Sequence, residues 1–203
     1  MKKRVCLIKR KTKETEINLI LNIDGKGKSE INTGIGILDH MLELFSFHGF
    51  FDLKIKVKSD LKKIDLHHTN EDIGIVLGEA FKKALGDKKG IRRFGFFALP
   101  MEDNLALVSL DISGRSYLKL VMDNRLRFSQ RQDRYSLEDL EHFLDSFVRH
   151  LGMNLYIIIK TTKTNDLHSV MEPVFKALGI ALDQATQIEE RRKGIPSTKG
   201  IID

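Results

Sequence analysis

The chain has 203 residues, of which 41% are hydrophobic and 31% are charged, and its formal net charge is +6 at pH 7. Such a chain can bury the core of one large domain or of two small ones. It contains no apolar run of roughly 18 residues, which excludes a membrane-spanning helix, and its N-terminal segment lacks the apolar stretch of a secretory signal. We therefore expect a globular, cytoplasmic protein with no membrane partner.

The single cysteine, Cys6, restricts the possible metal ligands, and the basic charge restricts the possible binding partners. One thiol can form neither an internal disulfide nor a zinc site with several thiolates, so any metal must be held by histidines and carboxylates. The net charge suits a lysine-rich solvated surface, a small anionic substrate or a nucleic acid. Because aromatic residues do not alternate with the lysines and no RNA-binding or helix-turn-helix signature occurs, we expect no nucleic-acid partner.

The first predicted elements alternate between strand and helix. A short β run over residues 19–23 ends near Gly25, and residues 38–47 have apolar side chains at helical spacing. Residues 54–58 alternate polar and apolar side chains, as a half-exposed strand does. Residues 73–85 then form an apolar helical stripe.

The same order of elements is predicted again further along the chain. A β run covers residues 107–112, and a helix over 137–151 begins after Ser136, which we expect to be its N-cap with an acidic residue three positions later. Residues 155–159 are continuously apolar, which predicts a strand more buried than its counterpart. The last apolar helical stripe covers residues 174–182.

These two series of elements come from an internal duplication. Residues 38–43, with His40, match 140–145, with His142, at an offset of 102 residues, and His48 matches His150 at the same offset. Residues 52–58 match 154–160 at 102 as well, and residues 65–71 match 166–172 at an offset of 101. The upstream β runs match at an offset of 89, so one half must contain a longer loop. Four similar segments in one order are hard to obtain by chance. We expect an internally duplicated α+β protein with half-repeats 1–93 and 94–203, each an antiparallel sheet covered by helices.

The first half contains a constellation of possible metal ligands. His67 and Glu71 are separated by four positions, so on a helix their side chains lie on one face and can converge on one ion. His68 is about 100° around the helix from His67 and would face a different ion. His40, from the preceding predicted helix, adds another imidazole.

The second half repeats most of this set with His142, His168 and Glu172. A ligand set of imidazoles and carboxylates suits Mn, Fe or Zn, and more than one metal per subunit is expected. The alternative for the last segment is structural, because Ser169 and Glu172 have the spacing of a capping box. Pro173 lacks an N–H, which predicts an irregular helix start there.

Several short segments, in order and along the whole chain, are similar to one family. They are Arg10-x-Thr12-x-Glu14-Thr15, Thr33 to Leu42 (TGIGILDHML), Asp65-x-His67-His68-Thr69 with Glu71-Asp72, Lys89 to Gly95 (KGIRRFG), Ser113-Gly114-Arg115, Phe175-Lys176-Ala177 and Pro196 to Gly200 (PSTKG). No single segment is specific, but together they are. By these segments the chain resembles imidazoleglycerol-phosphate dehydratase.

The resemblance implies a fold like domain 2 of ribosomal protein S5, present twice. It also implies dehydration of D-erythro-imidazole-glycerol phosphate to imidazole-acetol phosphate in L-histidine biosynthesis. Two Mn²⁺ ions per subunit would stabilise negative charge on the substrate's imidazole ring. The family forms homo-oligomers of 24 subunits with metals between neighbours. The implied metal ligands are His40, His67, His68, Glu71, His142, His168 and Glu172.

The resemblance further implies which residues contact the substrate. Glu14 would lie against it and move protons during elimination, so the implied catalytic carboxylates are those of Glu14, Glu71 and Glu172. The phosphate requires cationic and hydroxyl donors, and part of this set lies in a C-terminal substrate-binding tail. The implied substrate-binding residues are Glu14, Arg93, Arg115, Lys176, Ser197 and Lys199.

Three residues depart from the family pattern. Ser169 stands where the family has the second histidine of the repeated motif, so we expect weaker binding at one metal site. Leu44 replaces a glutamine usual near the phosphate, and Tyr156 replaces a histidine usual on its strand. These departures leave two alternatives open. One is a divergent paralogue with the same fold and an impaired metal site, and the less favoured one is a basic nucleic-acid-binding domain.

Overall fold

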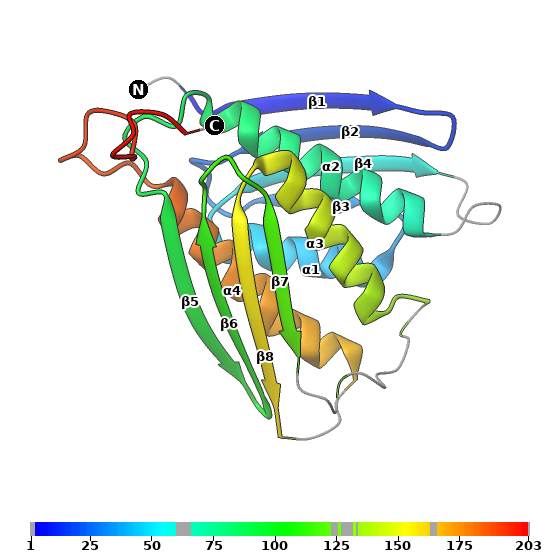
Figure 1. The fold of residues 1–203 in the computed structure, drawn as a ribbon. Coiled ribbons are helices and arrows are strands. Elements are labelled where there is room, and N and C mark those ends of the chain that lie inside the picture. Colours follow the sequence, from blue (N-terminus) through cyan, green and yellow to red (C-terminus); the bar gives the residue numbers. More distant parts are fainter. Residues whose placement is uncertain are drawn as a thin grey trace.

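The computed structural model describes residues 3–59, 66–122, 126, 132, 134–162 and 166–202. Each half of the chain has the element order β-β-β-α-β-α (Figure 1). The elements of the first half are β1 (Val5–Lys11), β2 (Thr15–Asn22), β3 (Ser29–Asn32), α1 (Gly36–His48), β4 (Asp52–Ser59) and α2 (Leu66–Leu85). Those of the second are β5 (Phe94–Met101), β6 (Asn104–Asp111), β7 (Tyr117–Met122), α3 (Leu137–Leu151), β8 (Asn154–Thr161) and α4 (Leu167–Thr186). The α+β class and the duplication are confirmed.

The two sheets have the same strand order, β1-β2-β4-β3 and β5-β6-β8-β7. Each is mixed, whereas the sequence predicted antiparallel sheets. The pairs β3–β4 and β7–β8 are parallel, and the other pairs are antiparallel. The reason is the connection: α1 joins β3 to β4 and α3 joins β7 to β8, and a helical crossover returns the chain to the starting end of its strand.

The four helices lie between the two sheets (Figure 1). Helices α1 and α2 pack on the first sheet, α3 and α4 on the second, and the pairs meet as α2 against α3 and α1 against α4. Glycines permit close contact at both meetings. A Cβ at Gly78 of α2 would lie 2.6 Å from the carbonyl oxygen of Phe147 in α3, and one at Gly179 of α4 would lie 2.5 Å from that of Phe45 in α1. The duplication therefore also repeats the helix contacts.

Helix starts follow local side chains. Ser136 caps α3 as predicted, because its hydroxyl accepts from the Asp139 N–H while the Asp139 carboxylate accepts from the Ser136 N–H. In α4 the N-cap is Asp166, whose carboxylate accepts from the Ser169 N–H. The predicted capping box at Ser169 is therefore wrong, since the helix begins two residues before it. Pro173 lies inside α4, so the helix start itself is regular.

The outer faces of the two sheets differ where β4 corresponds to β8. Outward residues of β4 are Lys54, Lys56 and Lys58, whereas β8 presents Tyr156, which is 45% exposed. The prediction that this strand is more buried than its counterpart is confirmed, because Ile158 is half-buried where Lys56 is exposed and Ile159 is buried where Val57 is half-buried. Around Tyr156 the same outer face contains further exposed aromatic side chains, those of Phe94, Phe96 and Tyr117.

The predicted longer loop lies in the second half, between Met122 and Leu137, where the first half needs only the segment from Asn32 to Gly36. Part of this connection lies outside the described residues. Near its end the connection contacts α2, since the hydroxyl of the fully buried Tyr135 donates to Oδ1 of Asn70 at 2.9 Å. Within the described chain, no helix is both long and apolar enough to span a membrane.

Candidate metal centres and substrate site

The first candidate metal centre lies where α2 meets α3. His67 and Glu71 project from one face of α2, with Nε2 of His67 3.2 Å from Oε1 of Glu71. His142 of α3 faces them, and its Nδ1 is 3.0 Å from Nδ1 of His67. One ligand atom from each residue lies within 4.8 Å of the others. We call this group the α2–α3 triad.

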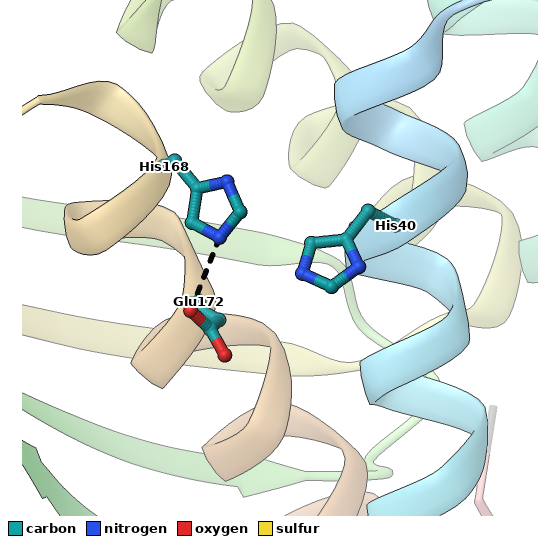
Figure 2. Close-up of side chains that lie close together, drawn as sticks. All are labelled: His40, His168 and Glu172. Carbon is teal, nitrogen blue, oxygen red and sulfur yellow. Dashed lines mark ion pairs between the residues drawn. The ribbon is translucent and has the colours of Figure 1, made fainter.

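The second candidate centre lies where α1 meets α4. His168 and Glu172 share a face of α4, with Nε2 of His168 3.2 Å from Oε2 of Glu172. His40 of α1 points at this pair from the other side, and the rings of His40 and His168 are 4.9 Å apart (Figure 2). Their ligand atoms again lie within 4.8 Å of one another. We call this group the α1–α4 triad.

Each triad combines the two halves of the chain. The α2–α3 triad takes two ligands from the first half and His142 from the second, and the α1–α4 triad takes two from the second half and His40 from the first. Both halves contribute histidines and a glutamate to these groups, but neither half builds a triad alone. The centres form because helices from different halves pack against each other between the sheets, and not within either half alone.

The residues that follow His67 and His168 point away from the triads, as a rotation of about 100° along a helix requires. Nδ1 of His68 lies 3.6 Å from Oε2 of Glu14. The hydroxyl of Ser169 donates to Oδ2 of Asp166 at 3.0 Å. The structure therefore brings six of the seven predicted ligands into two groups and separates His68 from both.

Glu14 sits in the turn between β1 and β2. The hydroxyl of Thr12 accepts hydrogen bonds from the backbone N–H groups of Glu14 and Thr15, at 3.1 and 2.9 Å. Together with His68, Glu71 and other side chains, Glu14 lines a hollow of about 330 Å³. The predicted proton-transfer residue therefore lies beside the α2 ligands.

A buried network ties this turn to α2. The Thr15 hydroxyl donates to Oδ2 of Asp72 at 2.5 Å, and Nε of Arg10 donates to Oδ1 of Asp72 at 3.0 Å. Asp72 and Thr15 are only 8% and 3% exposed, and Asp72 directly follows the ligand Glu71. Arg10, Thr15 and Asp72 belong to the segments that resemble the family, but their spacing in the sequence predicts no contact, because only the fold brings them together.

Electrostatics distinguish the α1–α4 triad. Burial by itself would raise the pKa of the Glu172 carboxyl, but the hydrogen bond and positive charge of Lys176, 2.7 Å away, hold that pKa below its usual value. His48, at the end of α1, is close enough that burial and the Lys176 charge lower the pKa of its imidazole. The sequence matched His48 to His150 but assigned it no role. Lys176 thus keeps Glu172 ionised and ready to bind a cation.

Arg93 fixes the C-terminal tail. Its Nε and Nη2 donate to Oδ1 and Oδ2 of Asp111, at 2.6 and 3.0 Å, and this pairing raises the pKa of the guanidinium. Its Nη1 donates to the carbonyl oxygen of Pro196 at 2.9 Å. Ser197 is therefore held near the end of β6, and its hydroxyl accepts from the backbone N–H of Lys199 at 3.2 Å.

The predicted phosphate residues do not all come together in one chain. Arg93 lies at Asp111, the last residue of β6, and Arg115 follows shortly after it. Lys176 lies at the other end, because its Nζ is 3.9 Å from Sδ of Met101, which pairs with the first residue of β6. An eight-residue strand spans roughly 24 Å. A single phosphate cannot contact both groups within one subunit.

The two triads fit a divalent metal of the Mn, Fe or Zn type. Each offers two imidazole nitrogens and a carboxylate oxygen from residues that are neither fully buried nor fully exposed. Three protein ligands leave coordination positions for a substrate, as catalytic metal sites require. Fold and site together define a duplicated α+β protein with two imidazole–carboxylate centres, each built across the repeats.

Comparison with known proteins identifies the family. The family model described as imidazoleglycerol-phosphate dehydratase matches residues 33–182, and the chain belongs to this family. An imidazoleglycerol-phosphate dehydratase of Thermoanaerobacter sp. strain X514 is 52% identical over 199 residues, which cover 98% of this chain and 100% of the relative. These similarities do not favour a nucleic-acid-binding domain or a divergent paralogue with an impaired metal site.

Solved structures agree with this assignment. The imidazoleglycerol-phosphate dehydratase of Pyrococcus furiosus is 37% identical, with a TM-score of 0.76, and the match covers 96% of this chain and 99% of that one. The Staphylococcus aureus N315 enzyme is 34% identical, with a TM-score of 0.73, over 91% of this chain and 99% of that one. Both sequence and fold therefore belong to a family named for a hydro-lyase activity.

Proposed function

We propose that the chain is a hydro-lyase of L-histidine biosynthesis that converts D-erythro-imidazole-glycerol phosphate into imidazole-acetol phosphate. In this reaction the carbon that bears the imidazole ring loses its hydroxyl, and the neighbouring carbon loses a proton. The enol that forms rearranges to the ketone, so one water is released. The observation that carries the proposal is the convergence of six predicted ligands into two triads, in a chain of this family.

The proposed metal is Mn²⁺, two ions per subunit. One would be held by His67, Glu71 and His142, and the other by His40, His168 and Glu172. Bound metal would act as a Lewis acid that stabilises negative charge on the substrate's imidazole ring. Two centres suit this substrate because an imidazole ring has two nitrogens.

Three carboxylates have proposed catalytic roles. Glu71 and Glu172 hold the cations, and Glu14 moves a proton between substrate carbon and water. The position of Glu14 supports its role, since it lines the same hollow as Glu71 and His68. The network of Thr12, Thr15 and Asp72 fixes the backbone from which it projects.

The phosphate site is proposed to form between two copies of the chain. Arg93, Arg115, Ser197 and Lys199 would come from one copy, and Lys176 from another, because one chain keeps these groups at opposite ends of β6. The substrate-binding tail is proposed to belong to the half-repeat 94–203. The same reasoning supports a homo-oligomer, proposed to contain 24 subunits with metals between neighbours. His68, which points away from its own triad, would serve a neighbour's metal.

The exposed aromatic face of the second sheet is the proposed contact between copies. Phe94, Phe96, Tyr117 and Tyr156 lie on one face of this sheet and are each at least 45% exposed. A second copy of the chain would bury this apolar surface.

A cytoplasmic location remains a prediction, and the buried free thiol of Cys6 is compatible with it.

The experiment that tests the proposed function compares the native protein with Ser169→His. Metal content and imidazole-acetol phosphate formation are measured with added Mn²⁺. We expect two metals and turnover in both proteins, with one site of the native protein binding roughly tenfold more weakly than in Ser169→His. The reason is that a histidine at position 169 would point away from its own triad, as His68 does, and would add an imidazole to a neighbour's metal. Absence of metal binding and of turnover in both would contradict the proposed function.

A further inference from the structure

A buried polar brace joins the two helices of the α2–α3 triad. Asn70 lies in α2 between the ligands His67 and Glu71, and Tyr135 lies just before α3. The Tyr135 hydroxyl donates to Oδ1 of Asn70 at 2.9 Å, and Nδ2 of Asn70 donates to the carbonyl oxygen of Asp139 at 2.7 Å. Both side chains are 0% exposed.

The brace joins α2 to α3 one helical turn before the ligand His142. Asp139 is three residues before His142, so it lies on the same face of α3 one turn earlier. The Asp139 side chain is itself fixed, because it accepts from the N–H and hydroxyl of Ser136 at 2.8 and 2.7 Å. The brace therefore links α2, between its two ligands, to the first turn of the helix that provides the third.

Because these hydrogen bonds are buried, they restrict how α2 and α3 can be arranged. A buried amide or hydroxyl without a partner is costly, so only the arrangement of α2 and α3 that satisfies both groups of Asn70 is favourable. Burial also raises the pKa of Tyr135 well above its ordinary value, which keeps the phenol protonated as a donor. Apolar packing alone would allow the helices to slide more freely.

The other triad is built differently at the corresponding position. Met171 occupies in α4 the place that Asn70 has in α2, at the same offset of 101 that relates His168 to His67. The Met171 side chain is also 0% exposed, and it cannot form the two hydrogen bonds of an amide. The brace is therefore a feature of one triad and gives an asymmetry that can be measured.

We propose that Tyr135, acting through Asn70, is a positioning residue for the α2–α3 triad. It holds His67 and Glu71 at a fixed distance from His142, so that the three ligand atoms are arranged for a divalent cation before the cation binds. The inference rests on the proposed function in one respect, namely that the triads bind metal.

The test measures Mn²⁺ affinity with the free-ion electron paramagnetic resonance signal, in full-length protein. Tyr135→Phe is placed in two backgrounds, His40→Ala, which leaves the α2–α3 triad intact, and His142→Ala, which leaves the α1–α4 triad intact. We expect the substitution to weaken binding in the first background by roughly tenfold, the low end of the range for outer hydrogen-bond partners. Binding in the second background should be unchanged.

Two further variants separate positioning from stability. Ser46→Ala removes another fully buried hydroxyl, one that donates to the carbonyl oxygen of Phe51 at 2.6 Å, and should leave Mn²⁺ affinity unchanged despite lower stability. The double variant Tyr135→Phe with Asn70→Leu removes both polar partners of the brace, so its stability should recover while its Mn²⁺ affinity stays low.

The outcomes distinguish this inference from the proposed function. If neither the His40→Ala protein nor the His142→Ala protein binds Mn²⁺, the metal-binding part of the proposed function is wrong, and the inference is then wrong as well. If the backgrounds bind but Tyr135→Phe changes neither, or if the double variant recovers affinity together with stability, the brace only stabilises the fold and the inference is overturned.

Discussion

The two halves of the chain differ most on the surfaces that face away from the helices. Lys54 of β4 and Tyr156 of β8 occupy corresponding outward positions, one in a lysine-rich row and the other among exposed aromatic rings. The inward positions have stayed apolar in both halves, because they pack on helices. A duplicated fold therefore keeps what packing requires and is free to change what faces outward.

The triads show the same combination of shared plan and local difference. Both use an i, i+4 pair of histidine and glutamate with a histidine from a facing helix. The next residue is His68 in one half and Ser169 in the other, and the residue between the ligands is Asn70 in one and Met171 in the other. Equal ligand sets with unequal surroundings predict two centres of different affinity.

The largest expected effect comes from removing one ligand of each triad. His142→Ala and His40→Ala should each lose one metal equivalent and lower turnover by at least about a hundredfold, because each removes electrostatic stabilisation of the reacting ring. Metal content by elemental analysis and product formation provide the measurements. Retention of both metals in either variant would show that its triad is not a metal centre.

The next effect tests the outer faces. Tyr156→Lys copies the first half onto the second and should shrink the particle on a sizing column, because a charge would be buried in the proposed contact. Turnover should fall with particle size, since the phosphate site is proposed to need two copies. Lys54→Ala, at the corresponding position of the first sheet, is the control and should leave the particle unchanged. A full-size Tyr156→Lys particle would exclude this face as a contact.

A smaller effect is expected from the network behind Glu14. Thr15→Val keeps the shape of the side chain but removes the hydroxyl that donates to Asp72. We expect kcat to fall between roughly tenfold and a hundredfold through misplacement of Glu14, with little change in metal content.

Thr15→Ser, which keeps the hydroxyl, should recover most of this loss. In a Glu14→Gln background, Thr15→Val should cost almost nothing, because the residue it positions is already disabled. Additive losses in the double variant would mean that Thr15 acts independently of Glu14.

The smallest effect concerns helix starts. Ser136→Ala should lower the free energy of unfolding by about 1 kcal/mol, because it removes the side-chain cap of α3. Helix α1 begins after Ile35, which has no side-chain cap, so Ile35→Ala tests burial and not capping there. Denaturant unfolding measures both. A Ser136→Ala protein as stable as the native one would mean that α3 is held by packing alone.

The sequence predicted the central strands and missed the edges. Strands β2, β4, β6 and β8 were predicted, and each lies inside its sheet, whereas β1, β3, β5 and β7 were not, and each lies at an edge. An inner strand has two neighbours and one buried face, so its pattern of apolar residues is strongly constrained. Edge strands pair on one side only and tolerate charged residues, so their apolar pattern is too weak to be recognised in the sequence.

The site was predictable wherever it depends on local geometry. His67 with Glu71, and His168 with Glu172, follow from helical spacing alone. The addition of His142 to the first pair and His40 to the second was not predictable, because it depends on which helices pack together across the repeats. Residues that act through packing, such as Tyr135 and Asp72, were missed for the same reason.

The central claim is that two metal centres, each built across the repeats, support dehydration. The most direct test follows imidazole-acetol phosphate formation while Mn²⁺ is added back to fully chelated protein, with bound metal counted at each step. We predict no turnover without metal, and a rise that is complete only when two equivalents per chain are bound. Full turnover by the chelated protein would contradict the account.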